Sequence, residues 1–271
     1  MNQWTFFNDD FTESNKTALH YTDLSIQRAY GVFDFFKVVD GVEQSIEDHL
    51  DRFYFSASEM RLDLKYNRSE LKDIIRKLIQ KNEFKDGGIK ITLTGGYSED
   101  GYEIVKPNLI IACLLLPQTV PNAWKKGIQL ITYPHQRQLP HIKTIDYIMP
   151  IWLKPFIKSK NADDVLYCSN NKVTECPRSN FYIVTSDNKL ITPKEHILKG
   201  ITRKRILNTA SGFLQVEERE VTIEDVYNAS GAFISSTSKI VLPVNRVDQK
   251  EFKLSLSIAE KLRKELEQST A

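Results

Sequence analysis

The stretch RAYGVFDFFKVVDGVEQSIEDHLDRFYFSASEMRL, residues 28–62, decides the fold of the first part of this chain. β-forming residues cluster on both sides of Asp40-Gly41, a dipeptide typical of two-residue hairpin turns. An amphipathic pattern follows, with Ser45 as the expected N-cap, acidic residues in the first turn and Phe53 among the apolar positions. The stretch therefore predicts a β-hairpin followed directly by an amphipathic helix.

The remainder of the first half continues with a helix and two strands. The spacing of apolar residues predicts a helix over residues 69–82, and GIKITLTGG and NLIIACLLL predict two buried strands. PQTVPNAW (residues 117–124) holds two prolines between apolar segments, which is typical of a linker. We therefore expect a small N-terminal α/β domain, a linker and a larger C-terminal domain, over residues 1–117, 118–123 and 124–271.

The second half is richer in predicted strands. Strands are expected in GIQLITY, DVLYCS, FYIVTS, KLITP and LQVEERE, and helices from about Thr144 to Lys160, in ITRKRILNTAS and near LSLSIAEKLRKELEQ. A strand-rich layer with helices packed outside it accommodates this order. The chain as a whole therefore predicts the α+β class.

Composition and charge argue against several kinds of partner. With 37 Lys and Arg against 35 Asp and Glu, the chain lacks the positive field that recruits nucleic acid. No window approaches the roughly 18 to 20 apolar residues that span a bilayer, and the first ten residues lack a signal-peptide pattern. The three cysteines, Cys113, Cys168 and Cys176, are odd in number and indicate a reducing compartment. We expect a cytoplasmic protein with neither nucleic acid nor membrane as a partner.

The sequence also lacks the motifs of several enzyme classes. TGGYSEDG has neither the lysine of a Walker loop nor the spacing of G-x-G-x-x-G. The five histidines form no H-E-x-x-H pair, the cysteines have no metal-ligand spacing, and no G-x-S-x-G occurs. A metal hydrolase and a serine hydrolase therefore have little support, and we expect no bound metal.

Lys143 is the first candidate for covalent chemistry. It lies in QLPHIKTIDYIMP (residues 138–150), among Ile142, Ile145 and Ile148, which suggest burial. Burial lowers the pKa of a lysine, and a deprotonated amine is a nucleophile. A lysine at a helix entrance whose head reaches water is the more common outcome, so the residues alone leave both interpretations open.

A second candidate lies in KVTECPRSNFYIV, where Glu175 and Arg178 stand between two β-rich runs. Side chains that project from such a scaffold are held in place by it. A glutamate in this position is usually just solvated. It becomes functional beside a partner that needs a fixed negative charge, such as the protonated ring nitrogen of a pyridine cofactor.

Three further stretches offer groups that bind phosphate. In ILKGITRKRIL a glycine precedes a helix whose first amides, those of Ile201 and Thr202, have no intrahelical acceptor. FISSTSKIVLPV adds the hydroxyls of residues 235–238, and HLDRFYFSAS adds Arg52. Each signal alone also fits a plain helix cap, a turn, or a surface ion pair of Arg52 with Asp48.

The order of these pieces, rather than any single one, is informative. HLDRF, IKTIDY, TECPRSNF, GITR and then SST before LPV follow one another over nearly the whole chain. In this order the sequence resembles the class IV pyridoxal-phosphate aminotransferases, the fold type shared by D-amino-acid aminotransferase, branched-chain aminotransferase and aminodeoxychorismate lyase. The resemblance implies a two-domain fold of PLP type IV, a transaminase acting on an amino acid and a 2-oxo acid, and a homodimer whose site takes residues from both chains.

The resemblance also implies a role for each candidate residue. Lys143 would form the Schiff base with the aldehyde of pyridoxal 5'-phosphate and carry the proton between the substrate Cα and the cofactor C4′. Glu175 would keep the pyridine nitrogen protonated, and Tyr147 would bond the 3-hydroxyl, although it follows the lysine by four residues where the branched-chain enzymes have five. The phosphate would be held by Arg52, the amides of Ile201 and Thr202, and Thr237.

The sequence departs from its relatives where they bind the substrate carboxylate. D-amino-acid enzymes typically carry an arginine after the strand that matches ITLTGG, and here Tyr97 and Ser98 follow. Arg28 and Arg178 stand at unusual places, and arginine binds a carboxylate in a bidentate manner. We therefore hypothesise an atypical D-amino-acid aminotransferase in which these two arginines bind the carboxylate, the alternative being that one of them merely pairs with Asp34 or an N-terminal acid.

Three other functions remain open at this stage. Branched-chain L-amino-acid transamination is second, because Phe33, Phe35 and Ile240 are apolar candidates for a side-chain pocket. Aminodeoxychorismate lyase is third, since the threonine that its relatives place near this part of the strand is missing. A degenerate scaffold that binds a phosphorylated ligand is the non-enzyme alternative, and the presence of both Lys143 and Glu175 argues against it.

Overall fold

The computed structural model describes residues 3–116, 123–252 and 256–268. The chain forms two compact units, Met1–Pro117 with Ile142–Asp146 and Gln118–His141 with Tyr147–Ala271. The expected linker, residues 118–123, lies outside the described residues except for Ala123.

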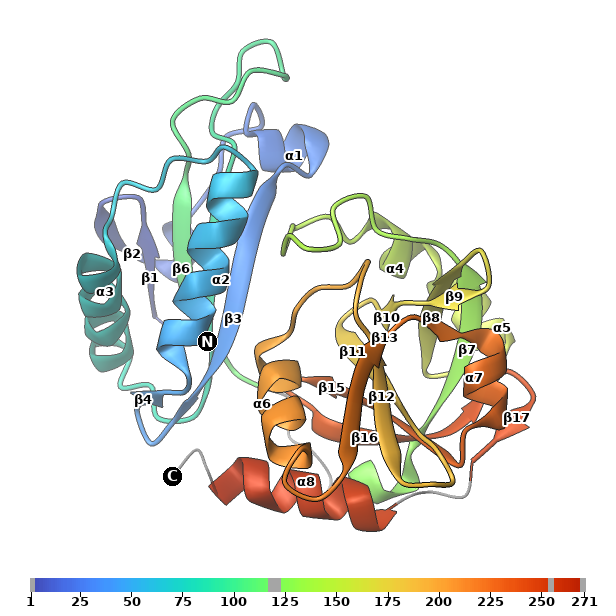
Figure 1. The fold of residues 1–271 in the computed structure, drawn as a ribbon. Coiled ribbons are helices and arrows are strands. Elements are labelled where there is room, and N and C mark those ends of the chain that lie inside the picture. Colours follow the sequence, from blue (N-terminus) through green and yellow to red (C-terminus); the bar gives the residue numbers. More distant parts are fainter. Residues whose placement is uncertain (1–2, 117–122, 253–255, 269–271) are drawn as a thin grey trace. The chain divides into compact units, whose positions relative to one another are not determined.

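The first unit is built on a six-stranded antiparallel sheet with the strand order β2-β1-β6-β5-β3-β4 (Figure 1). Its strands are β1 (Trp4–Phe7), β2 (Asp10–Glu13), β3 (Gly31–Val39), β4 (Val42–Glu43), β5 (Gly87–Thr94) and β6 (Leu109–Leu114). Its helices are η1 (Ser14–Lys16), α1 (Leu24–Arg28), α2 (Ile46–Glu59) and α3 (Arg68–Lys81).

The hairpin and the helix predicted from residues 28–62 are both confirmed. Asp40 and Gly41 have φ of 48° and 78°, the positive values that this turn requires. Ser45 stands at the N-cap position of α2, as predicted. Its side chain forms no capping hydrogen bond, so the predicted capping interaction is wrong. Its own φ of 54° is left-handed, whereas a capping serine has extended backbone angles.

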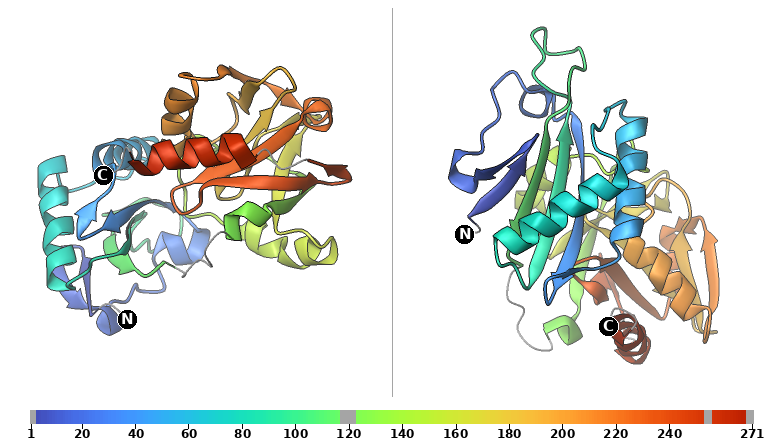
Figure 2. Two further views of the ribbon diagram at one scale, coloured as in Figure 1. Left: turned by 90° about the horizontal axis from the view of Figure 1, so that it is seen from below. Right: turned by 90° about the vertical axis from the view of Figure 1, so that its left-hand side faces the viewer.

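Strand alternation gives the sheet of the first unit two different faces. One face, the covered face, is buried under α2 and α3, which lie across it in Figure 2. It includes Val32, Phe36, Ile89, Ile91 and Leu93, all at most 1% exposed. The other face, the open face, is only half-buried and comprises Phe33, Phe35, Lys37, Lys90 and Thr92.

The segment Ile142–Asp146 joins the first unit by pairing with the edge of β3. The Phe33 N–H donates to the Lys143 carbonyl at 3.0 Å, and the Ile145 N–H donates to the Gly31 carbonyl at 3.0 Å. This edge of β3 is available because β4 pairs only with its last two residues. A division of the sequence at residue 117 alone does not anticipate this return of the chain.

The second unit contains an eleven-stranded sheet with the order β13-β12-β11-β15-β16-β7-β8-β9-β14, to which β10 and β17 add at β11 and β16. Its strands are β7 (Ile128–Pro134), β8 (Asp164–Ser169), β9 (Lys172–Val173), β10 (Glu175–Cys176), β11 (Ser179–Val184), β12 (Lys189–Pro193), β13 (Gln215–Arg219), β14 (Val221–Thr222), β15 (Gly231–Ser236), β16 (Ile240–Val247) and β17 (Lys250–Glu251). Its helices are η2 (Ala123–Lys126), α4 (Ile148–Trp152), α5 (Lys154–Ser159), α6 (Ile201–Ala210), α7 (Ile223–Asn228) and α8 (Leu256–Gln268).

The single helix expected from about Thr144 to Lys160 is wrong. The chain is extended at Thr144, which bridges to β3, and two short helices, α4 and α5, follow. Pro155 lies in the first turn of α5, where its missing N–H is tolerated but a continuous helix is not. Because α4 begins only at Ile148, Tyr147 stands at its N-cap position.

Two cores lie on opposite sides of the central strands of the second unit. Tyr182 of β11 stacks on Phe233 of β15, with ring centres 4.6 Å apart, in the core that α6 and α8 cover. Phe181 and Ile183 point the other way, into the core that includes Val226 of α7. β11 is buried on both faces, and the expected α+β class is confirmed.

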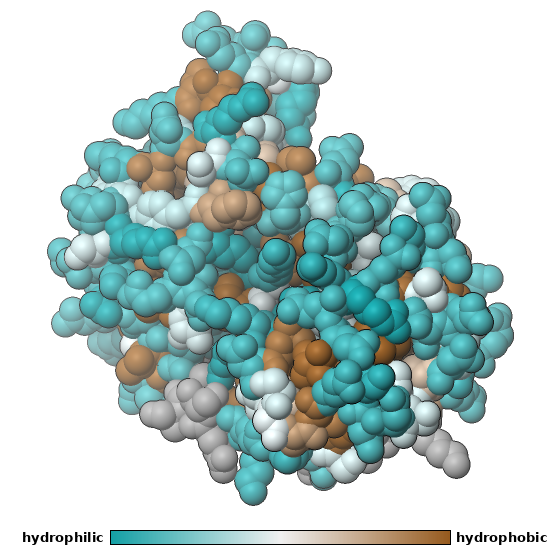
Figure 3. Space-filling view, in the orientation of Figure 1, coloured by the Kyte–Doolittle hydropathy of each residue, from teal (hydrophilic) through white to brown (hydrophobic). Residues whose placement is uncertain are grey.

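No helix among the described residues is long and apolar enough to cross a membrane. On the face drawn in Figure 3, hydrophilic side chains predominate and hydrophobic ones form small groups between them.

Candidate active site

Lys143 is positioned by the core of the first unit and by its own backbone. Ile142 is 2% exposed and belongs to the hydrophobic core, and the Lys143 N–H donates to the Ser56 hydroxyl at 3.3 Å. The Lys143 side chain is half-buried, and its Nζ lies 4.4 Å from the centre of the Phe33 ring. The amine therefore stands at the open face of the sheet, over an aromatic ring.

Arg52 belongs to a buried charge cluster formed by β3 and α2. Its Nε donates to Asp34 Oδ2 at 2.8 Å and its Nη2 to Asp34 Oδ1 at 2.9 Å, which is a bidentate pair. His49 Nδ1 lies 2.7 Å from the same Oδ1. The side chains of Asp34, His49 and Arg52 are 0%, 3% and 11% exposed. The surface pair with Asp48 considered above is therefore not the one that forms.

The surroundings fix the charges of this cluster. Burial favours a raised pKa for Asp34, but the charge of Arg52 and the bonds from His49 and Arg52 hold that pKa well below its usual range. Burial lowers the pKa of His49, and the charges of Arg52 and Lys143 lower it further, although the bond to Asp34 opposes them. A neutral His49 then donates from Nδ1 to an ionised Asp34.

The same cluster orients Arg52 for an anion. Two of its nitrogens, Nε and Nη2, are held by Asp34. Its Nη1 has no acceptor among the described residues, which leaves two N–H donors for a ligand. Because Asp34 is fully buried and fixed, the guanidinium is held in one orientation.

Arg28 lies apart from this cluster, at the end of α1. It is exposed, its Nη1 donates to the Gln27 carbonyl at 2.9 Å, and its guanidinium lies 5.6 Å from the centre of the Tyr102 ring. Within the described chain it has no acidic partner, and Asp34 pairs with Arg52 instead.

Glu175 is placed in the second unit by the short strand β10 and is 4% exposed. Its Oε1 accepts from Arg137 Nη1 at 3.2 Å, and its Oε2 accepts from the Leu198 N–H at 3.0 Å. A cation and a backbone amide thus hold the two carboxylate oxygens. Arg137 was not singled out from the sequence, because an arginine in a polar stretch gives no local signal of a buried partner.

Tyr167 of β8 also escaped sequence reasoning. It is 1% exposed, and its hydroxyl has no hydrogen-bond partner among the described residues. Burial raises the pKa of this hydroxyl, and the nearby carboxylates of Asp164 and Glu175 raise it further. A buried hydroxyl left in this state calls for a polar ligand, so it marks this side of Glu175 as part of a binding site. Only the strand DVLYCS could be predicted from the sequence.

α6 begins with amides that have no acceptor. Gly200 is the N-cap, and the N–H groups of Ile201 and Thr202 find no acceptor among the described residues. A Cβ at Gly200 would lie 2.3 Å from Asn180 Oδ1, so a side chain does not fit there. Asn180 Nδ2 donates to the Leu198 carbonyl at 2.8 Å and fixes the approach to the helix. A ten-residue helix that starts in this way offers a phosphate site.

Thr237 lies in the turn between β15 and β16 and is half-buried. Its hydroxyl has no hydrogen-bond partner among the described side chains and backbone groups. The neighbouring hydroxyls of Ser236 and Ser238 lie 3.5 Å apart. Thr237 therefore retains a donor that a phosphate oxygen accepts.

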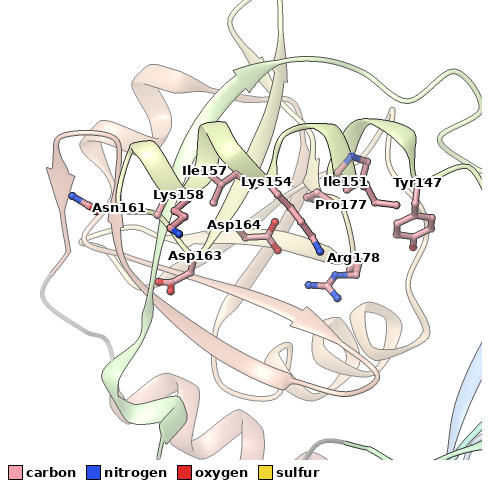
Figure 4. A pocket seen from close by; sticks show the side chains of 12 residues that line it. Tyr147, Ile151, Lys154, Ile157, Lys158, Asn161, Asp163, Asp164, Pro177 and Arg178 are labelled. Atoms are coloured by element: carbon pink, nitrogen blue, oxygen red, sulfur yellow. The ribbon is translucent and has the colours of Figure 1, made fainter.

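Tyr147 and Arg178 line one pocket of about 630 Å³ in the second unit. Figure 4 shows Arg178 and Lys154 reaching toward the same part of this pocket, with Tyr147 at one end. Arg178 is exposed and forms no ion pair within the described residues. Ile151 adds an apolar wall.

The predicted site residues thus fall into two groups. Lys143 and Arg52 lie near one another in the first unit, joined through β3, while Arg28 lies at the end of α1. In the second unit, Leu198 links Glu175 to the start of α6 because it bonds both Glu175 and Asn180. The roles of the residues in both groups remain predictions.

Each of the two groups, taken by itself, offers side chains that suit parts of a phosphorylated pyridine with an aldehyde. A half-buried amine suits the aldehyde, a buried carboxylate suits the ring nitrogen, and the free donors of Arg52, of the α6 amides and of Thr237 suit a phosphate. The orphan hydroxyl of Tyr167 beside the carboxylate gives independent support for a polar ligand. Fold and donors together define an enzyme of the pyridoxal-phosphate type.

The chain belongs to the amino-transferase class IV family, whose model matches residues 31–247. Enzymes of this family are aminotransferases and use pyridoxal 5'-phosphate, and the resemblance inferred from the ordered motifs is confirmed.

Two relatives in sequence are D-alanine aminotransferases. A D-alanine aminotransferase from Staphylococcus haemolyticus is 28% identical over 249 residues, which cover 90% of this chain and 88% of that protein. A D-alanine aminotransferase from Bacillus licheniformis is 27% identical over 248 residues, which cover 89% and 87%.

Solved structures carry other activities on the same fold. A branched-chain amino acid aminotransferase from Escherichia coli has a TM-score of 0.90 at 19% identity, covering 100% of this chain and 95% of that one. A putative 4-amino-4-deoxychorismate lyase from Legionella pneumophila has a TM-score of 0.85 at 24% identity, covering 94% and 96%. At these identities the likeness establishes the fold, and the expected fold type IV is confirmed.

Proposed function

We propose that this protein is an atypical D-amino-acid aminotransferase, in which Arg28 and Arg178 bind the substrate α-carboxylate. The observation that carries the proposal is Arg178, which lines a pocket beside Tyr147 without an acidic partner in the described chain. An exposed guanidinium in a pocket of about 630 Å³ suits a bidentate carboxylate. The D-alanine aminotransferases among the relatives agree with this choice of substrate.

The residues of the first unit supply the proton chemistry in this proposal. The Lys143 amine would hold the cofactor through its aldehyde and, once released as a free amine, would take the proton from the substrate Cα and deliver it to C4′. The Phe33 ring, 4.4 Å from Nζ, shields one side of the amine from water. Arg52, oriented by Asp34, binds the cofactor phosphate through Nη1.

The residues of the second unit stabilise charge. Glu175, held by Arg137 and the Leu198 amide, keeps a proton on the pyridine nitrogen. When bound, the pyridine ring of the cofactor accepts the electron pair that deprotonation leaves on the substrate. The amides of Ile201 and Thr202 and the Thr237 hydroxyl add donors for the phosphate, and Tyr147 bonds the 3-hydroxyl.

The proposal is tested by half-reactions of the purified protein with D-alanine, D-glutamate, L-leucine and L-glutamate, followed by the cofactor spectrum. We expect the two D-amino acids to react. Arg28→Ala and Arg178→Ala should each raise the substrate Michaelis constant by about 10- to 100-fold, because a charged hydrogen-bond pair contributes about 1.5–3 kcal/mol. The proposal fails if neither variant changes the Michaelis constant, or if only L-amino acids react.

The same panel separates the alternatives. Reaction with L-leucine and L-glutamate alone would identify branched-chain transamination, for which Phe33 and Phe35 on the open face are apolar candidates. Conversion of aminodeoxychorismate without amino transfer would identify the lyase. A colourless protein that takes up no pyridoxal 5'-phosphate would leave only the phosphate-binding scaffold.

We also propose that the chain works as a homodimer. Ile148, Ile151 and Trp152 of α4 are 64%, 63% and 64% exposed, and such a group of apolar side chains is typical of a surface that another chain covers. Light scattering during gel filtration checks the mass. A mass equal to one chain at micromolar concentration would contradict the proposal.

A further inference from the structure

Asp23 is a buried carboxylate without a cationic partner. It stands directly before α1 and is 0% exposed, and no cationic side chain among the described residues forms an ion pair with it. A fully buried aspartate is rare unless its charge is paired. In this protein a set of four neutral donors takes the place of the cation.

The four donors come from three different parts of the first unit. Oδ1 of Asp23 accepts from the Ser25 N–H at 2.8 Å and from the Ser25 hydroxyl at 2.6 Å, both in α1. Oδ2 accepts from the Thr94 hydroxyl, at the end of β5, and from Asn108 Nδ2, directly before β6, each at 2.8 Å. Two donors at each oxygen satisfy the carboxylate. Asp23 therefore joins α1 to the ends of two strands of the sheet.

α1 depends on this connection because it is short. It has five residues, and a helix of this length is not stable through its own hydrogen bonds. The Asp23 carbonyl adds to the connection, since it accepts from the Ile26 N–H at 2.9 Å and from the Gln27 N–H at 3.0 Å. The residue after Gln27 is Arg28, whose side chain is exposed at the end of the helix. The place of Arg28 is therefore set by the place of α1.

The loop between β5 and β6 is tied to the same helix (Figure 1). The Leu24 N–H of α1 donates to the Gly96 carbonyl of this loop at 3.0 Å. Further along the loop, the Tyr102 ring has its centre 5.6 Å from the Arg28 guanidinium. A change at Asp23 therefore reaches Arg28 from two sides, through the helix and through the loop.

We propose that Asp23 is a positioning residue for Arg28, which holds α1 on the strand ends so that the guanidinium is aligned before the substrate α-carboxylate arrives. The proposal rests on the proposed function, in which Arg28 binds that carboxylate. A guanidinium that is already aligned loses less conformational entropy when the substrate binds. Asp23 itself contacts neither substrate nor cofactor.

Asp23→Asn is the most direct substitution, because it keeps the shape of the side chain and replaces one oxygen by a nitrogen that donates. In the place of Oδ1 this nitrogen faces the Ser25 N–H, and in the place of Oδ2 it faces Asn108 Nδ2. Asn108 cannot reverse its amide without losing the bond in which its Oδ1 accepts from Asn8 Nδ2 at 2.9 Å. Either orientation therefore sets two donors against each other and weakens the connection of α1 to the sheet.

Steady-state kinetics tests the consequence for the substrate. Asp23→Asn should raise the Michaelis constant for D-alanine by about 5- to 50-fold and leave kcat within about twofold, because only the binding of the carboxylate is weakened. Added to Arg28→Ala, it should raise the constant by less than about twofold more, because the guanidinium that it positions is gone. A general loss of structure would instead lower kcat, or add in full to the effect of Arg28→Ala.

Asn82→Ala is the matched control for lost hydrogen bonds in the same unit. Asn82 Oδ1 accepts from the Trp4 N–H at 2.9 Å and its Nδ2 donates to the Trp4 carbonyl at 2.9 Å, which joins α3 to β1. None of its bonds reaches α1 or the loop after β5. The Michaelis constant of this variant should therefore stay within about twofold of the natural value.

Hydrogen exchange follows α1 without any substrate. The amides of Ser25, Ile26 and Gln27 all donate to Asp23. In the cofactor-loaded protein, exchange in a peptide of residues 22–30 should therefore become about tenfold faster in Asp23→Asn, while exchange in a peptide from α3 stays the same.

The outcomes separate this proposal from the proposed function. If α1 exchanges no faster in Asp23→Asn, or if its Michaelis constant is unchanged where Arg28→Ala raises it, or if the two substitutions are additive, Asp23 does not position Arg28. If α1 exchanges faster but Arg28→Ala leaves the Michaelis constant unchanged, the proposed role of Arg28 fails, and Asp23 only stabilises the helix.

Thr94→Val keeps the proposal testable if Asp23→Asn does not fold. It removes one of the four donors, the hydroxyl that bonds Oδ2, and leaves the carboxylate in place. We expect a rise of about two- to fivefold in the Michaelis constant for D-alanine when Arg28 is present and none in Arg28→Ala. An equal rise in both backgrounds, or no rise in either, would overturn the proposal.

Discussion

The two faces of the six-stranded sheet share the same strands but differ in chemistry. On the covered face, Val32, Phe36 and Ile89 are 0% exposed and pack under α2 and α3. On the open face, Phe33 and Lys90 are half-buried, and the Lys143 amine stands over Phe33. Alternation along a strand thus separates side chains that stabilise the unit from side chains that a substrate can reach.

One residue departs from this division. Asp34 has the parity of the covered face and is 0% exposed, yet it is charged. It remains ionised because Arg52 and His49 bond it, and Arg52 in turn keeps donors for a phosphate. The comparison therefore predicts that changes on the open face alter chemistry at nearly constant stability, and that a change at Asp34 alters stability first.

The largest effect is expected from Lys143→Ala. Because this amine moves the proton at the substrate, its loss should lower the rate of the half-reaction by about 10²- to 10⁴-fold. The variant should also lose the yellow colour that the Schiff base between Lys143 and the cofactor gives the protein and that borohydride bleaches. The melting temperature of the cofactor-free protein should change little, since the side chain is half-buried and its amine lies over Phe33 at the open face. Stopped-flow absorbance and thermal unfolding check the two statements.

Lys37→Ala is the control for this variant, since Lys37 is a half-buried lysine of the same face. It should keep both the absorbance and the rate. If Lys143→Ala remained yellow and active, the amine would have no covalent role and the division between the faces would lose its functional meaning.

Asp34→Asn should produce the next largest effect, now on stability. It leaves Arg52 buried without its carboxylate, and breaking a buried ion pair from one side costs about 3–5 kcal/mol in the free energy of unfolding. Urea unfolding of the cofactor-free protein measures this free energy. A loss below about 1 kcal/mol would contradict this prediction, because Asp34 would then contribute no more to the free energy of unfolding than a surface ion pair does.

Asp51→Asn serves as the matched control. Asp51 also pairs with an arginine, Arg68, but the two side chains are 63% and 43% exposed. Surface pairs of this kind contribute about 0–1 kcal/mol, so the control should be nearly as stable as the natural protein.

Much of the fold could be predicted because local signals were strong. The Asp40-Gly41 turn, the helix over residues 69–82 and the runs of buried strands follow from turn chemistry and periodicity, and all appear close to their expected bounds. The helix from Thr144 to Lys160 failed because its first residues pair with β3. No local pattern reports that a distant strand has an unpaired edge.

The candidate site divides in the same way. Ordered motifs pointed to Lys143, Glu175 and the start of α6, because each motif is local in sequence. Arg137 and Tyr167 were missed, because only the folded unit brings them to Glu175. Asp34 was considered as a partner for Arg28 or Arg178 and pairs with Arg52 instead, since sequence cannot tell which arginine a buried carboxylate faces.

The third prediction concerns the pH dependence of the covered face. Burial lowers the pKa of His49 below its unfolded value of about 6.5, so the unfolded chain takes up a proton first as the pH falls. The contribution of His49 is fully present above about pH 6.5 and is lost below it. The lowered pKa of Asp34 acts in the same direction, but only below about pH 4.

His49→Asn tests this assignment, because its amide nitrogen is as many bonds from the backbone as Nδ1 and does not titrate. The natural protein should lose about 1–2 kcal/mol of unfolding free energy between pH 7 and pH 5, and the variant should lose about 1 kcal/mol less. Urea unfolding of both proteins at pH 7 and at pH 5 measures these losses. Equal losses would mean that the pKa of His49 is the same in the folded and the unfolded chain.

The smallest effect is expected where the open face meets the backbone of the sheet. In Gly88→Ala, the new Cβ would lie 2.2 Å from Phe35 Cζ, so the ring must move. Because the ring is half-buried and its far end can swing outward, the cost should be about 1 kcal/mol rather than the larger cost of an overpacked core. In Phe35→Ala the obstacle is gone, and adding Gly88→Ala to it should cost almost nothing in urea unfolding. If the two substitutions were instead additive, Phe35 would not be the side chain that yields, and the open face would be packed as tightly as the covered one.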